Sequence, residues 1–134
     1  AILNVKLPHL DQWNQKRRAA ADKYDQQLSS ISNVLIPARV AWSEHVFHQY
    51  TIRVTDGRRD ELQKYLAGHK IPSMIYYPVP MHEQAAFNKL VRRRVPLLQT
   101  EKVSKEVLSL PMHPDLGDDQ IAYICEHVAK FFAA

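Results

Sequence analysis

The sequence contains little cysteine, little glycine and no long hydrophobic run. Its 134 residues include one cysteine and 3 glycines, against 8 prolines. A single cysteine excludes an intrachain disulfide, and with it a disulfide-stapled secreted scaffold. So few glycines disfavour a glycine-rich loop that cradles phosphate, and neither GxxxxGKS nor GxGxxG occurs. The uncharged stretches are short and interrupted by polar residues, so no transmembrane helix is expected.

The chain also lacks an initial methionine. It begins at Ala1 and enters an apolar, helix-compatible segment at once. No basic segment followed by a cleavage site precedes this helix, so a signal peptide is not expected. We therefore expect the sequence to be part of a longer protein.

The remaining composition is that of an ordinary globular domain. Hydrophobic residues make up 46% and charged residues 24%, which suits one domain with one modest core. The net charge is +4, and its excess is concentrated in residues 88–106. A basic stretch can attract nucleic acid or a nucleotide. No aromatic side chain is interleaved with Arg92, Arg93 and Arg94 to stack on bases, so a solvated connecting segment is the better interpretation.

Hydrophobic periodicity predicts alternating helices and strands. Helices are predicted over residues 9–30, over residues 58–69 with Gly68 at the C-cap, from Thr100 as N-cap, and from Gly117 onward. Strands or extended segments are predicted over residues 34–43, 45–54, 73–77 and 107–111. This order indicates an α+β fold, in which a small, mostly antiparallel sheet is covered by helices on mainly one face and preceded by a long connecting helix.

The isolated reactive residue types predict no chemistry by themselves. His45 and His48 would point to opposite faces of a strand, and neither HExxH nor a Cys/His ligand spacing occurs, so no metal site is predicted. His48 is expected to be partly buried and hydrogen-bonded. Cys125 is expected to be a buried structural thiol rather than a nucleophile. There is no GxSxG nucleophile elbow.

Candidate binding residues concentrate in residues 71–87. This segment holds two tyrosines, three prolines and a histidine, with few charges. The prolines favour a fixed, extended path. In a regular strand Tyr76 and Tyr77 would point to opposite faces, so one could join the core while the other presents its hydroxyl to a ligand. His82 could add a polar group. Composition alone favours a structural role for the segment and leaves the binding role open.

Four ordered segments, which cover nearly the whole chain, match the pattern of one family. They are AILNVKLPHLDQWNQKRRAAADKYDQQL, HVFHQYTIRVTDGRRDELQKYL, GHKIPSMIYYPVPMHEQAAF and VLSLPMHPDLGDDQIAYI. Together they resemble the C-terminal part of DegT/StrS-type sugar aminotransferases, which are pyridoxal-phosphate enzymes of aminotransferase fold type I. The resemblance implies that residues 1–32 form the connecting helix from a large domain and that residues 33–134 form the small C-terminal α+β domain.

The resemblance also implies an activity for the parent protein. Such enzymes move an amino group, commonly from glutamate, to a nucleotide-linked keto sugar, as in polysaccharide biosynthesis. The family's Schiff-base lysine lies before the segment that matches Ala1, so no catalytic or cofactor-binding residue is expected in this chain, which alone would be inactive and free of pyridoxal phosphate. The family is usually dimeric, so the full-length protein is expected to be a homodimer. The single cysteine fits a reducing cytoplasm, no membrane partner is expected from the hydropathy, and nucleic acid is the disfavoured partner.

The resemblance places substrate contacts in the Tyr-Tyr-Pro segment. In relatives the pair before this proline often reads His-Tyr and contacts the nucleotide-sugar, whereas here it reads Tyr76-Tyr77. A tyrosine can donate a hydrogen bond but brings no positive charge to a diphosphate. We therefore expect Tyr77, then Tyr76 and then His82 to bind substrate and help the domain close over it, without transferring protons.

One hypothesis from a different class stays open at this point. The net charge of +4 and the run Arg92-Arg93-Arg94 also suit a small basic α+β module that binds nucleic acid or a regulatory protein partner. If the chain instead belongs to a sugar aminotransferase, the same arginines would supply positive charge near the diphosphate of the nucleotide-sugar. The apolar side chains of Ile2, Leu3, Val5 and Leu7 would normally be covered by the rest of a longer protein, and should be exposed here.

Overall fold

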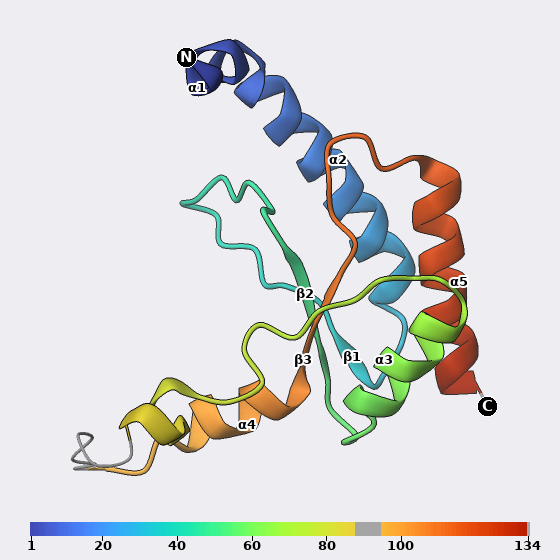
Figure 1. Ribbon diagram of the computed structural model, residues 1–134. Coiled ribbons are helices and arrows are strands. Elements are labelled where there is room, and N and C mark those ends of the chain that lie inside the picture. The colour runs from blue at the N-terminus through green and yellow to red at the C-terminus, as the bar shows by residue number, and fades with distance from the viewer. Residues whose placement is uncertain (88–94, 134) are drawn as a thin grey trace.

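A computed structural model describes residues 1–87 and 95–133. The helices are α1 (Ile2–Lys6), α2 (Leu10–Leu28), α3 (Arg59–Gly68), α4 (Leu98–Glu106) and α5 (Asp118–Ala133), with the 3-10 turns η1 (Leu7–His9), η2 (Met81–Glu83) and η3 (Ala85–Phe87). The strands are β1 (Val34–Leu35), β2 (Tyr50–Val54) and β3 (Val107–Leu110), in the order β1-β2-β3 and antiparallel throughout (Figure 1). The predicted α+β fold with a small antiparallel sheet is confirmed.

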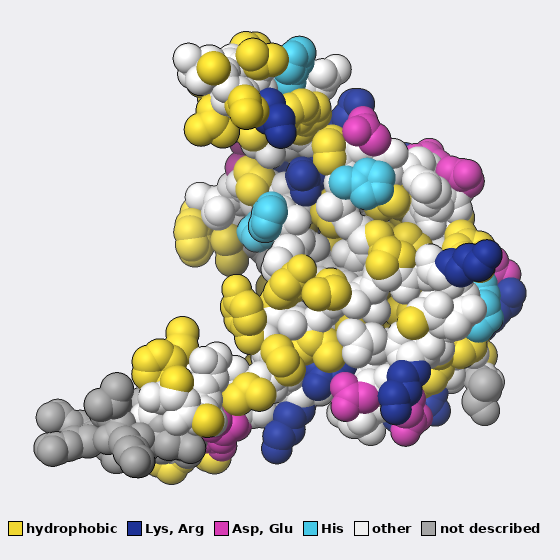
Figure 2. All heavy atoms as spheres, viewed as in Figure 1, with side chains coloured by type: hydrophobic (Ala, Val, Ile, Leu, Met, Phe, Trp, Pro, Cys, Tyr) yellow, Lys and Arg dark blue, Asp and Glu magenta, His cyan; other side chains and the backbone are white. Residues whose placement is uncertain are grey.

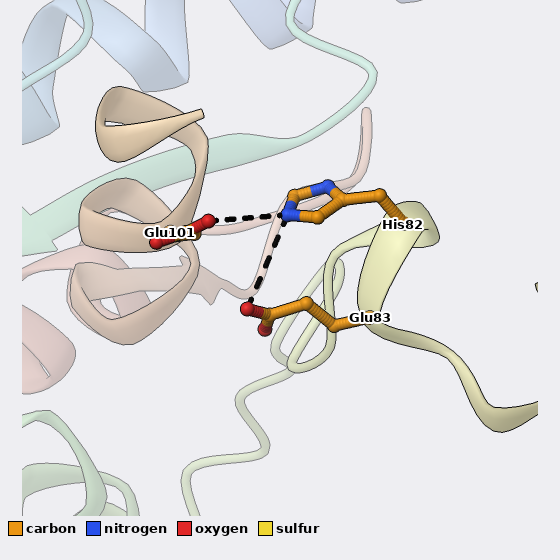
Figure 3. A group of neighbouring side chains, drawn as sticks. All are labelled: His82, Glu83 and Glu101. Carbon is orange, nitrogen blue, oxygen red and sulfur yellow. Dashed lines mark hydrogen bonds and ion pairs between the residues drawn. The ribbon is translucent and has the colours of Figure 1, made fainter. Parts of the chain in front are cut away.

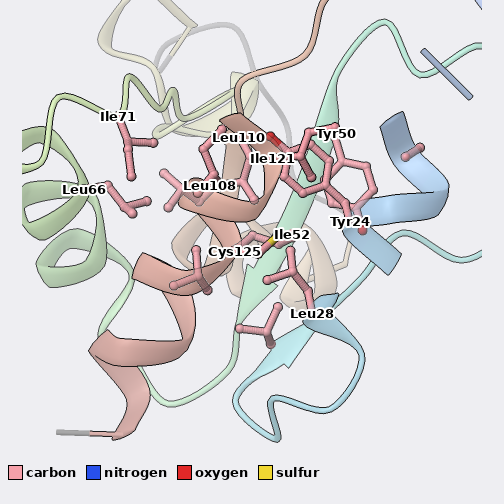
Figure 4. Close-up of a cluster of buried hydrophobic side chains, with 14 of the residues drawn as sticks. Tyr24, Leu28, Tyr50, Ile52, Leu66, Ile71, Leu108, Leu110, Ile121 and Cys125 are labelled. Carbon is pink, nitrogen blue, oxygen red and sulfur yellow. The ribbon is translucent and has the colours of Figure 1, made fainter. Parts of the chain in front are cut away.

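The core lies between one face of this sheet and the helices α2, α3 and α5. In β2 the side chains of Tyr50, Ile52 and Val54 are fully buried, while those between them are only partly covered, as expected for a strand with one buried face. The other labelled core residues come from α2, α3, β3, α5 and the segment after α3 and converge on the same space (Figure 4). Helices therefore cover mainly one face of the sheet, as the sequence predicts.

Two stacked tyrosines carry polar groups into this core and satisfy them there. The rings of Tyr24 and Tyr50 lie 4.7 Å apart. The Tyr24 hydroxyl donates to the Pro111 carbonyl at 2.9 Å, and the Tyr50 hydroxyl donates to Asp25 Oδ1 at 2.6 Å. Burial raises the pKa of both phenols, and for Tyr50 the hydrogen bond to the Asp25 carboxylate raises it further. Both tyrosines thus add core packing without leaving an unpaired hydroxyl.

Cys125 behaves as the sequence predicts. Its side chain is 3% exposed on the inner face of α5, and burial raises the pKa of the thiol to about 12. A thiol that stays protonated and covered is a poor nucleophile. The prediction of a buried structural cysteine is confirmed.

The predicted strand over residues 45–54 begins five residues late, at Tyr50. Phe47 has a left-handed φ of +47° and a buried ring, and its amide donates to His45 Nδ1 at 3.0 Å, so the chain turns before the strand. His48 consequently lies exposed, and the prediction that it is partly buried is wrong. The apolar Phe47 interrupts the alternation of apolar and polar residues along this segment.

The predicted strand over residues 73–77 is also wrong. The structure has only an isolated bridge there, in which Met74 and Ser109 exchange backbone hydrogen bonds of 3.0 and 2.7 Å. The prolines at 72, 78 and 80 flank this segment and remove the amide donors that a longer ladder would need. The segment therefore contacts β3 only at this bridge. Residues 73–87, which continue from it, are called the strap below.

Two predicted helix caps are also misplaced. α4 begins at Leu98, with Leu97 rather than Thr100 as its N-cap. At the end of α3, Gly68 is the last helical residue, and the left-handed conformation falls on Lys70, with a φ of +60°. The Ile71 amide reaches back to the Leu66 carbonyl at 2.9 Å, and both of these side chains are buried. This hydrophobic contact across the helix end outweighs the usual preference for glycine at the left-handed position.

The N-terminal end projects from the body of the fold. α1 and the first turns of α2 extend away from the sheet, whereas Ala20, Ala21, Tyr24 and Leu28 of the same helix lie in the core (Figure 1). Hydrophobic side chains gather on the projecting end (Figure 2). The expected exposure is confirmed for four of them: Ile2, Leu3, Val5 and Leu7. No helix in the described ranges is long and apolar enough to cross a membrane.

Candidate functional site

A groove of about 730 Å³ lies between the strap and the helix α4. Its lining comes from both walls and comprises Tyr76, Tyr77, Val79, Pro80, Met81, Gln84, Gln99, Thr100, Val103, Ser104 and Val107. A concave, mainly apolar site of this size is typical of small-molecule pockets. The part of the chain that carries η2 and α4 extends away from the sheet (Figure 1), and hydrophobic side chains are prominent on its surface (Figure 2).

Two of the three predicted site residues form one corner of this groove. The rings of Tyr76 and Tyr77 lie 5.9 Å apart in an edge-to-face arrangement, with 75° between their planes. Tyr76 is 39% and Tyr77 73% exposed, so neither ring joins the core. Neither ring therefore takes the core position that the sequence left open for one of them.

The second wall of the groove is supported by a buried arginine. Arg59 donates from Nη1 to the carbonyls of Ser104 and Val107, at 3.2 and 3.0 Å, and its side chain is 9% exposed. These carbonyls lie where α4 passes into β3, and the last carbonyls of a helix have no partner within the helix itself. The Arg59 guanidinium thus fixes the junction that holds Val103, Ser104 and Val107 against the groove. Sequence reasoning missed this wall, although Val103 and Val107 lie only four residues apart in the sequence.

The third predicted residue, His82, lies outside the groove lining. Its imidazole sits between η2 and α4, with Nε2 3.3 Å from Glu101 Oε1 and 4.0 Å from Glu83 Oε1 (Figure 3). The His82 side chain is only 8% exposed. A hydrogen bond from this imidazole to Glu101 joins the two walls of the groove, since η2 belongs to the strap and Glu101 to the first turn of α4.

His82, Glu83 and Glu101 are also the one group of described residues whose metal-ligand atoms converge, all within 4.8 Å of one another. Imidazole and carboxylate are donors that first-row divalent cations accept. Sequence spacing could not reveal this group, because Glu101 lies far along the chain from the other two. The sequence-based prediction of no metal site stays a prediction.

The described lysines do not fit a Schiff base with pyridoxal phosphate. Each lies exposed or half-exposed: Lys6, Lys16, Lys23, Lys64, Lys70, Lys102, Lys105 and Lys130. None of them lines the groove. A Schiff-base lysine needs a desolvated or cationic setting that lowers the pKa of its amine. Lys89, Arg92, Arg93 and Arg94, which carry the predicted basic stretch, fall outside the described residues.

Comparisons with known proteins point to one family. The sequence model of the DegT/DnrJ/EryC1/StrS aminotransferase family matches residues 1–129. A protein of Geobacillus stearothermophilus, named a pleiotropic regulatory protein, is 45% identical over 98% of this chain and 36% of its own length. A UDP-N-acetyl-3-dehydro-alpha-D-glucosamine 3-aminotransferase of Acidithiobacillus ferrooxidans is 39% identical over 96% of this chain and 34% of its own.

The structural comparison agrees with the sequence comparison. The crystal structure of DesV from S. venezuelae, in complex with a ketimine intermediate, superposes with a TM-score of 0.92 at 31% identity, over 99% of this chain and 35% of that one. The chain therefore spans about a third of the length of the relatives it matches.

Proposed function

Because the chain belongs to the DegT/DnrJ/EryC1/StrS aminotransferase family, we propose that it is the small C-terminal domain of a pyridoxal-phosphate-dependent aminotransferase that acts on a nucleotide-linked keto sugar. The observation that carries this proposal is the open, tyrosine-cornered groove in a chain of that family. The relative from Acidithiobacillus ferrooxidans is named for a UDP-linked 3-keto sugar, which supports the substrate class. Glutamate is the proposed amino donor.

The proposed division of labour follows from what the described residues can do. Tyr77 and Tyr76 bind the nucleotide-sugar through their ring faces and hydroxyls, and His82 positions the strap that carries them against α4. Pyridoxal phosphate supplies the electron sink for amino transfer, and its lysine belongs to the rest of the parent enzyme. This chain's own residues bind and orient the substrate and exclude water as the domain closes.

The same proposal assigns the two parts of the chain. Residues 1–32 connect the small domain to the large one, and residues 33–134 are the small domain itself. The exposed apolar side chains Ile2, Leu3, Val5 and Leu7 support a covering large domain, since apolar patches of this kind mark contact surfaces. The C-terminal half of α2 packs in the core and so anchors the connection to the small domain.

We extend the proposal to the state of the parent enzyme. A homodimer in the cytoplasm is proposed, with no membrane or nucleic-acid partner. The buried, unpaired Cys125 suits a reducing compartment.

The test uses the parent enzyme and this chain side by side. The parent, incubated with glutamate, pyridoxal phosphate and a UDP-linked 3-keto sugar, should yield the amino sugar and 2-oxoglutarate, measured by mass spectrometry. The 134-residue chain, treated with pyridoxal phosphate and borohydride, should show no stoichiometric adduct on one lysine. A parent that transaminates no nucleotide-linked keto sugar, or a defined adduct on this chain, would contradict the proposal.

A further inference from the structure

Two histidines face each other where the end of α3 lies against α5 (Figure 1). The ring centroids of His69, which follows the last residue of α3, and of His127 on α5 lie 4.1 Å apart, with 39° between the ring planes. His127 is only 8% exposed and His69 is half-buried. Two neutral imidazoles can pack in this way, whereas two imidazolium ions at this distance repel each other because both carry a positive charge. The packing of the pair therefore depends on its protonation.

Tyr65, one helical turn before His69 on α3, is hydrogen-bonded to both rings. His69 Nδ1 donates to the Tyr65 carbonyl at 2.8 Å, since a carbonyl oxygen only accepts. The Tyr65 hydroxyl lies 3.2 Å from His127 Nδ1. A neutral His127 with its proton on Nε2 accepts the hydrogen bond of this hydroxyl, and a proton gained at Nδ1 removes the acceptor. A proton on His127 thus removes a hydrogen bond and, when His69 is also charged, adds repulsion.

The surrounding titratable groups leave this repulsion largely in place. They come from α3, from α5 and from the residue after His69: Tyr65, Tyr123, Glu126, Lys130 and Lys70. Glu126 and Lys130 form an ion pair with each other at 2.6 Å, so their charges partly balance. Burial lowers the pKa of His127, the neighbouring His69 and Lys130 lower it further, and Glu126 raises it. His127 therefore stays neutral to a lower pH when it is packed against His69 than when the two rings are apart.

The chain passes from this histidine pair directly into the strap. The Ile71 amide donates to the Leu66 carbonyl at 2.9 Å, and the Ile71 side chain is buried. The Tyr123 hydroxyl of α5 donates to the His69 carbonyl at 3.3 Å. These contacts fix the turn from which the strap leaves α3. Separation of the two rings would remove one side of this turn's packing and loosen it.

We propose that His69 and His127 form an acid-sensitive clasp, which holds the end of α3 and the start of the strap against α5 while at least one imidazole is neutral and releases them when both are protonated. Above about pH 6.5, the ordinary pKa of histidine, protonation does not favour the open form. Below it, the open form binds protons more readily than the closed form, so opening becomes more favourable as the pH falls. The clasp depends on the packing of this chain and not on the proposed reaction.

Hydrogen-exchange mass spectrometry of the 134-residue protein between pH 7.5 and 5 tests the clasp. Each exchange rate is divided by the intrinsic rate at that pH, so that the ratio reports opening alone. Opening over residues 66–74 should rise about tenfold from pH 7.5 to 5, the factor that corresponds to a difference of one pKa unit between the closed and open forms. Residues 20–28, in the buried half of α2, should show no such rise. Equal opening of residues 66–74 at both ends of the pH range would overturn the inference.

Variants assign the pH dependence to the pair. His69→Gln and His127→Gln each keep a polar side chain but remove one titratable ring, so the rise should disappear in both. The pH dependence is the readout, because a lost ring contact raises opening at every pH. His48→Gln is the matched control and should keep the rise, since His48 is exposed in the segment before β2. A rise that persists in both His69→Gln and His127→Gln would contradict the clasp.

A titration followed by NMR tests the coupling between the two rings directly. The ring-proton signal of His127 should titrate with a midpoint below pH 6.5, and His69→Gln should raise that midpoint because it removes the neighbouring positive charge. A purely structural contact between the rings would leave the midpoint where it is. An unchanged His127 midpoint in His69→Gln would therefore overturn the inference, even if the variant changed the level of opening.

Discussion

Three buried side chains with ionisable protons, Cys125, Tyr24 and Tyr50, should make the free energy of unfolding fall at high pH. The pKa of Cys125 rises from 9.0 to about 12, and those of Tyr24 and Tyr50 rise above their usual 10.0, in each case mainly because burial disfavours the charged form. The unfolded chain releases these protons from about pH 9 upward, while the native chain keeps them. The free energy of unfolding should therefore be unaffected by these groups below pH 9 and fall as the pH rises from 9 toward 12.

Urea denaturation between pH 7 and 10.5 checks this prediction. Cys125→Ala should make the fall between pH 9 and 10 shallower, because the thiol is the first of these three groups to titrate in the unfolded state, although it lowers stability at every pH by leaving a small void. Tyr123→Phe is the control, since Tyr123 is exposed. A free energy of unfolding that stays level up to pH 10.5 would contradict the prediction.

Arg59 is the second residue from which a measurable effect is expected. Its guanidinium closes the end of α4 through the carbonyls of Ser104 and Val107. Arg59→Met keeps the apolar stem but removes the donors, and hydrogen bonds that involve a charged group contribute about 1.5–3 kcal/mol. We expect a loss of about 2–3 kcal/mol in the free energy of unfolding, measured by chemical denaturation. Lys64→Met on the exposed side of the same helix should change it by less than about 0.5 kcal/mol, as surface substitutions usually do.

At the scale of elements, His82 joins η2 to α4. The 3.3 Å contact between Nε2 and Glu101 Oε1 is a polar link between η2 and the first turn of α4. His82→Leu should break it and speed amide exchange over residues 81–87 by about tenfold, which corresponds to about 1.4 kcal/mol of local opening free energy. Hydrogen-exchange mass spectrometry measures this directly.

The control for this prediction is the neighbouring carboxylate. Glu101→Gln should speed exchange less than His82→Leu does, because an amide oxygen can still accept from the imidazole. If a chelator alone reproduces the effect of His82→Leu, a bound cation rather than a hydrogen bond joins these elements and the prediction is wrong.

The elements also show what the sequence could and could not predict. α2, α3 and α5 follow from helical periodicity, because one face of each is buried against the sheet. The strap after Ser73 does not, because its path depends on a single bridge to β3 and on packing against α4, which is distant in sequence. The same separation in sequence explains which parts of the site could be predicted. Tyr76 and Tyr77 could be singled out from the composition of residues 71–87, whereas the α4 wall and the partner of His82 could not.

At the scale of the whole molecule, the projecting N-terminal end carries several exposed apolar side chains. Ile2, Leu3 and Val5 are 75%, 79% and 71% exposed, and α1, which carries them, lies away from the C-terminal end of α2 (Figure 1). Burying an aliphatic side chain of this size contributes about 1.5–3 kcal/mol. When nothing else covers this surface, pairing of two copies of the chain through their projecting ends would bury it, and we expect reversible self-association.

Substituting these side chains should weaken the association without weakening the fold. Leu3→Gln with Val5→Gln should raise the dissociation constant at least tenfold in sedimentation velocity, since even one lost side-chain contact of about 1.5 kcal/mol gives that factor. The melting temperature should stay the same, because neither residue belongs to the core. Leu35→Gln, which alters an exposed leucine on β1, should leave the association unchanged. A monomeric chain at all concentrations, or equal association of both variants, would show that the projecting end is not the contact surface. That outcome would also remove the support that this surface gives to a covering large domain.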